Sequence, residues 1–65
     1  MPTAVEAIPE LSIVALKHAV ESKRGTVPEG RKGTIVHVED SQHYLVEFPE
    51  PRCVLALERD DIRLV

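Results

Sequence analysis

The stretch Glu29-Gly30-Arg31-Lys32-Gly33-Thr34-Ile35-Val36-His37-Val38 decides the fold of this chain. Two glycines three positions apart lead into a run of β-branched residues. Glycine adopts the positive φ of a tight bend without the strain that other residues pay. Valine and isoleucine suit the pleated, half-buried surface of a strand. The stretch predicts a turn into a strand over residues 34–39, which the alternating segment 44–48 follows after a short polar connection.

Three more segments have the character of strands. Residues 11–17 form an apolar run, residues 53–57 are apolar at every position, and residues 62–65 are a short closing strand. Between the first two predicted strands, residues 18–31 mix glycine and proline with charged residues, which is typical of a long loop. Residues 58–61 are polar and predict a short 3₁₀ turn.

A helix competes for the first of these segments. Leu11, Val14, Ala15 and His18 fall at helical spacing, and residues 19–21 could continue the same face. A strand is favoured because isoleucine and valine are adjacent in the middle of the segment and the later strands need an opening partner.

Five short strands about ten residues apart, with one long loop after the first, predict an all-β fold. The architecture that fits is a small five-stranded SH3-like barrel with a short 3₁₀ turn before the last strand. The barrel domain is expected over residues 11–65, and residues 1–10 form an N-terminal lead-in segment.

The small size of the chain limits its stability. A domain of 65 residues buries only about 60% of the surface of its unfolded chain and often needs a disulfide, a metal or a partner chain. Cys53 is the single cysteine, so no internal disulfide can form. The three histidines lack the paired spacing of a zinc site, and no cofactor is expected. Self-association is the remaining source of stability, and a homo-oligomer is therefore expected.

Composition also predicts a compartment. A lone cysteine and an N-terminus without a basic region followed by an apolar core indicate a cytoplasmic protein. No apolar run approaches the roughly 20 residues that span a bilayer, so no membrane association is expected.

Four segments of the chain resemble a bacterial family of short proteins to which no function is assigned. The resemblance covers most of the chain from Leu11 onward. Its most specific part is the glycine-threonine strand followed by the tyrosine strand. The matching segments are Leu-Ser-Ile-Val-Ala-Leu over residues 11–16, Pro-Glu-Gly-Arg-Lys-Gly-Thr-Ile-Val-His-Val over residues 28–38, Tyr-Leu-Val-Glu-Phe over residues 44–48 and Leu-Ala-Leu-Glu-Arg-Asp-Asp-Ile-Arg-Leu-Val over residues 55–65.

This resemblance implies an SH3-like barrel, distantly similar to the barrel of the nitrile hydratase β subunit and to the KOW modules of ribosomal and transcription proteins. Members of the family commonly begin the first strand with aspartate, whereas this chain has Ser12. The resemblance brings no catalytic residues to this chain.

The strand at 53–57 carries the main functional prediction, because a strand of a small isolated barrel should have one wet face. Exposed aliphatic side chains mark a contact surface. The expected surface consists of Ile13, Cys53, Leu55 and Leu57 if Val54 and Ala56 point inward, and the reverse orientation of this strand stays open. The surface predicts a non-catalytic interaction module that self-associates and binds a protein partner. Alternatively, residues 5–8 fold back over this face.

A second hypothesis is a KOW-like module that binds nucleic acid. Lys23, Arg24, Arg31 and Lys32 lie in one basic segment and could contact phosphates. The net charge of −3 and the two aromatic residues of the whole chain argue against a nucleic-acid partner.

A third hypothesis is an oligomeric small-barrel enzyme or small-ligand binder. Plasmid-encoded trimethoprim-resistant dihydrofolate reductases are SH3-like and similar in length, and residues 56–59 share their Ala-Leu-Glu-Arg. The chain lacks their Val-Gln-Ile-Tyr site motif. Cys53 lies in an apolar run, where cysteine acts as a small hydrophobe, and the prediction is therefore that the protein is not an enzyme.

Overall fold

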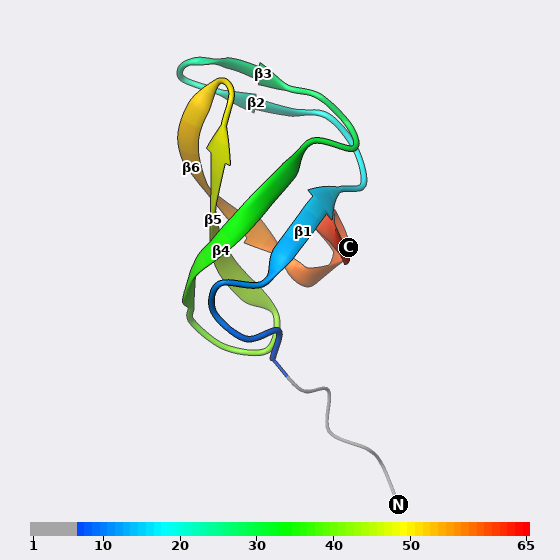
Figure 1. Cartoon of the computed structure of the whole chain (residues 1–65), viewed down its shortest axis with the longest axis vertical. Helices are drawn as coiled ribbons and strands as arrows, with labels where there is room; N and C mark the ends of the chain where they lie inside the picture. Colours follow the sequence, from blue (N-terminus) through cyan, green and yellow to red (C-terminus); the bar gives the residue numbers. More distant parts are fainter. Residues whose placement is uncertain (1–6) are drawn as a thin grey trace, which may run out of the picture.

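The computed structural model describes residues 7–65, and they form an all-β fold (Figure 1). A five-stranded antiparallel sheet has the strand order β6-β5-β4-β1-β7, and β2 and β3 make a separate two-stranded hairpin. The elements are β1 (Ile13–Leu16), β2 (Val20–Ser22), β3 (Gly25–Val27), β4 (Lys32–Val38), β5 (His43–Pro49), β6 (Arg52–Glu58), the 3₁₀ turn η1 (Arg59–Asp61) and β7 (Ile62–Leu64).

The all-β prediction is confirmed: the five predicted strands form the main sheet, the 3₁₀ turn precedes the last of them, and β1 is a strand and not a helix. The main sheet ends at β6 on one side and at β7 on the other, and within residues 7–65 these two strands do not pair. The sheet is therefore strongly curved but not closed by a complete ring of strand pairs (Figure 1).

The predicted long loop over residues 18–31 is wrong in one respect, because it contains the hairpin β2–β3. The turn of this hairpin is built by Ser22, whose Oγ donates to the Gly25 carbonyl at 2.6 Å and accepts the Arg24 N–H at 3.2 Å. Gly25 has φ 122°, which an L side chain would strain. Val27 is completely buried and anchors the hairpin to the core.

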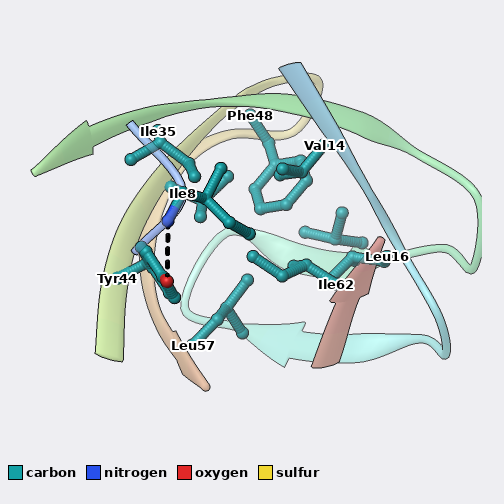
Figure 2. Close-up of a cluster of buried hydrophobic side chains, with 10 residues drawn as sticks. Ile8, Val14, Leu16, Ile35, Tyr44, Phe48, Leu57 and Ile62 are labelled. Carbon is teal, nitrogen blue, oxygen red and sulfur yellow. Dashed lines mark hydrogen bonds between the residues drawn. The ribbon is translucent and has the colours of Figure 1, made fainter. Parts of the chain in front are cut away.

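The core lies on the inward face of the sheet and is closed by the hairpin (Figure 2). Tyr44, Val46 and Phe48 alternate inward along β5, so both aromatic residues of the chain are buried. The cluster comprises Ile8, Val14, Leu16, Val27, Ile35, Tyr44, Val46, Phe48, Leu57 and Ile62.

Ile8 belongs to the lead-in segment and is buried in this core. Its N–H donates to the Tyr44 hydroxyl at 3.0 Å, and that hydroxyl donates to the Ser41 carbonyl at 2.8 Å (Figure 2). Residues 5–8 were the alternative cover for the apolar strand, and Val5 and Glu6 of this segment lie outside the described residues.

The two glycines of the fold-deciding stretch have different roles. Gly30 has φ 85° and open space around it, so it serves the turn. Gly33 has no positive φ; a Cβ there would lie 2.7 Å from Phe48 Cε1 and 2.8 Å from Val46 Cγ1. Gly33 therefore makes room for the core.

Candidate functional site

The β6 residues predicted to face outward point toward the core. Cys53, Leu55 and Leu57 face inward, because the register pairs them with the inward residues of β5. Leu57 is only 6% exposed and belongs to the core, so it adds little area to the predicted contact surface. Cys53 and Leu55 are half-buried because they lie along an open edge of the sheet. The outward face of β6 carries Val54 and Ala56.

One row of side chains crosses the outward face of the sheet, with an aliphatic residue at each end and two polar residues between them. The strand registers align Ile13 with Thr34, Thr34 with Glu47, and Glu47 with Val54. Ile13 is 45% exposed and Val54 is 52% exposed. Large apolar side chains at both ends of this row are therefore in contact with water.

A β-bulge adds to this surface. The register between β4 and β5 shifts between Ile35 and His37, so the extra residue Val36 has no partner on β5. Ile35 faces inward, whereas Val36 and His37 are both exposed. Leu45, opposite His37, is exposed as well, and the aliphatic surface therefore continues along the outward face.

The outer edge of β6 has no strand partner in the part of the chain that the structure describes. This edge is seven residues long and carries free backbone donors and acceptors along its length. A long unpaired edge is a template for pairing with another chain. The opposite edge strand, β7, has only three residues.

A groove of about 640 Å³ runs beside this edge, between β6 and the hairpin β2–β3. It brings together residues of the predicted basic segment and of the predicted apolar surface. The cations at the hairpin turn lie across the groove from the half-buried residues of β6. The lining residues are Glu21, Ser22, Lys23, Arg24, Cys53, Val54 and Leu55. Figure 1 shows the hairpin passing above the connection from β5 to β6.

The predicted basic segment does not form one cluster. Lys23 and Arg24 are exposed at the hairpin turn. Arg31 is half-buried and its Nη1 donates to the Glu50 carbonyl at 2.6 Å. Lys32 lines a different cavity of about 370 Å³ on the outward face, together with Arg52. The backbone path separates these residues because the chain forms a hairpin where a loop was expected.

The two ends of β6 carry opposite charges that sequence reasoning missed. Arg52 begins the strand and Glu58 ends it, and both are exposed. Neither side chain makes an ion pair within residues 7–65. Asp60 follows in η1 and adds a second exposed carboxylate at the acidic end. The signal was present in the sequence as an apolar strand flanked by one cation and one anion.

Two histidine–carboxylate pairs lie on the surface. His18 Nε2 is 2.8 Å from Asp61 Oδ1, and His43 Nδ1 is 2.9 Å from Asp40 Oδ1. The hydrogen bond with Asp61 is the largest cause that raises the pKa of His18, and the Ala19 carbonyl adds to it. The hydrogen bond with Asp40 likewise raises the pKa of His43.

These pairs connect neighbouring segments of the fold. Asp61 Oδ2 accepts the Glu58 N–H at 2.8 Å, which is the largest cause that lowers the pKa of Asp61. The His18–Asp61 pair thus joins the segment after β1 to η1 at the far end of the sequence. Among residues 7–65, no group of histidine, cysteine and carboxylate side chains is arranged to hold a metal ion.

Comparison of the chain with protein-family models, with curated protein sequences and with solved structures finds no match in any of the three. No helix within residues 7–65 has the length and apolar character needed to cross a membrane.

Proposed function

We propose that this protein is a non-catalytic interaction module on an SH3-like barrel, and that it associates with itself through β6. The barrel is supported by the order of the elements: five strands, a hairpin between the first two of them, and a 3₁₀ turn before the last. It agrees with the resemblance to the bacterial family of short SH3-like proteins.

The observation that carries the proposal is an unpaired seven-residue edge strand that carries an exposed valine, Val54, on its outward face. Complete burial of a valine or isoleucine side chain contributes roughly 1.5–3 kcal/mol. Val54 and Ile13 are about half exposed, so a contact that covers either one gains about 1 kcal/mol. Such gains matter in a domain whose single core supplies only about 3–5 kcal/mol.

The remaining surface supports a role for a protein partner. Val36 and Leu45 lie on the outward face of β4 and β5, away from the edge of β6. A second protein could cover them while the edge stays engaged. The proposal gives no chemical step to Cys53 or to the histidine–carboxylate pairs, which connect parts of the fold.

Sedimentation equilibrium at micromolar concentration tests the proposal. The wild-type protein is expected to sediment as a dimer or a larger species. Val54→Glu places a charge on the exposed face of β6 and should give a folded monomer. Leu64→Glu is the matched control, because Leu64 is equally exposed but lies on the opposite edge strand. A wild-type protein that remains monomeric would overturn the proposal.

A further inference from the structure

We infer that two copies of this chain pair along their β6 strands, antiparallel, about a two-fold axis that passes beside Leu55. The inference rests on the proposed self-association and specifies its geometry. Each β6 would gain the backbone partner that it lacks within residues 7–65, and the two five-stranded sheets would join into one continuous sheet.

The sequence of β6 is suited to pairing with itself. Its centre is Leu55, and an antiparallel pairing about that residue places Arg52 opposite the partner subunit's Glu58. The two-fold axis repeats this contact, so the interface contains two identical ion pairs. Side chains of opposite charge that face each other on neighbouring strands stabilise the pairing of those strands. Isologous contacts of this kind are self-complementary and close after two copies.

The apolar positions match in the same register. Val54 lies opposite the partner subunit's Ala56 on the outward face. On the inward face, Cys53 lies opposite the partner subunit's Leu57, and the two Leu55 side chains meet at the axis. Cys53 and Leu55 are half-buried in the single chain, so the pairing covers the apolar surface that the open edge leaves in water.

The groove beside the edge provides room and additional charge complementarity. Its volume of about 640 Å³ can hold part of an extended strand between β6 and the hairpin. Lys23 and Arg24 line the wall next to the first half of β6. The partner's acidic end, with its Glu58 and Asp60, approaches this basic wall.

Other registers lose these contacts. A shift of one residue places the outward side chains of one strand against the inward side chains of the other. A shift of two residues keeps the faces but separates Arg52 from the partner subunit's Glu58. The register centred on Leu55 is the one that satisfies both the face and the charges.

Directed disulfide formation tests this register. Cys53 is replaced by serine, and a single new cysteine is introduced as Val54→Cys in one variant and Ala56→Cys in another. When the two are mixed and oxidised, a disulfide-linked heterodimer is expected, because these positions face each other across the axis. Neither variant alone should cross-link, since identical positions lie about 8 Å apart between Cα atoms, beyond the reach of a disulfide.

A charge exchange provides an independent readout by sedimentation. Arg52→Glu alone and Glu58→Arg alone should each dissociate to monomers, because each places like charges opposite each other. An equimolar mixture should form a heterodimer, since both ion pairs are then restored with reversed sign. Arg63→Glu is the matched control on β7 and should remain dimeric. Circular dichroism of each variant confirms that it is folded.

The outcomes separate this inference from the proposed function. A wild-type dimer without the selective cross-link overturns the β6 pairing and leaves self-association standing. A wild-type monomer overturns both. A wild-type monomer that binds a synthetic acidic peptide in the groove, seen as slower alkylation of Cys53, would identify an extended acidic segment as the occupant and also overturn the pairing.

Discussion

Replacing Gly33 with alanine tests the packing that fixes β4 against the core. A Cβ at this position would lie 2.7 Å from Phe48 Cε1, 2.8 Å from Phe48 Cδ1 and 2.8 Å from Val46 Cγ1. Both neighbours are completely buried, so neither side chain can move into solvent. The added methyl group must displace the Phe48 ring or the backbone of β4.

The expected loss of stability follows from two opposing effects. Overpacking a core by a methyl group costs about 1–3 kcal/mol. Alanine restricts the unfolded chain and returns roughly 0.4–1 kcal/mol. The free energy of unfolding should fall by about 1–2 kcal/mol. In a domain of this size, that loss lowers Tm by about 5–15 °C.

Urea and thermal unfolding, followed by circular dichroism at one fixed protein concentration, measure this change. Gly30→Ala is the control, because Gly30 has open space and φ 85°, so its cost of about 1 kcal/mol comes from backbone strain alone. In a Phe48→Leu background the cost of Gly33→Ala should shrink, whereas the cost of Gly30→Ala should not change. Equal costs of Gly33→Ala in both backgrounds would refute the packing argument.

Three further predictions concern other contacts. Tyr44→Phe leaves the Ile8 N–H without its acceptor and should cost about 1–3 kcal/mol; native-state hydrogen exchange at Ile8 should accelerate. Because the pKa of His18 is raised, the stabilisation from its pair with Asp61 is complete below pH about 6.5 and is lost as pH rises through the folded pKa. Asp61→Asn should lower the His18 pKa in an NMR titration and flatten this pH dependence, with His43 as the unchanged internal reference. Oligonucleotides titrated by fluorescence at low salt should not bind saturably, since the basic segment is dispersed.

The main sheet could be predicted from the sequence because its strands alternate clearly. Tyr44, Val46 and Phe48 face one side of β5 and Leu45 and Glu47 the other, so the period of two is unambiguous there. For β1 the sequence favours a strand over a helix, because β-branched residues occupy the middle of that segment and the later strands need an opening partner.

The hairpin and the face of β6 depended on tertiary contacts. The turn at residues 22–25 forms through Ser22 hydrogen bonds that leave only a weak composition signal. All of residues 53–57 are apolar, so alternation along β6 itself could not distinguish its two faces. The register with β5 decides the face, since Leu57 pairs with Tyr44 and must share its inward direction.

The groove could not be predicted for the same reason. Lys23 and Cys53 are thirty residues apart, and they line one groove because the hairpin lies across from β6. The sequence predicts a loop where the hairpin forms, and a loop gives no reason to place cations beside an apolar strand. The charges at Arg52 and Glu58 indicate a pairing surface only once the edge of β6 is known to be unpaired.

The two edges of the sheet differ in how they are protected, and this difference favours a closed dimer over open-ended association. β7 is three residues long, and short edge strands limit pairing with other chains. β6 has seven residues, no proline and no inward charge, and a groove separates its edge from the hairpin β2–β3, so the edge stays open to a partner strand. When two β6 strands pair, the long edge of each copy is covered. The joined sheet then ends in β7 at each side, and further addition of copies is disfavoured.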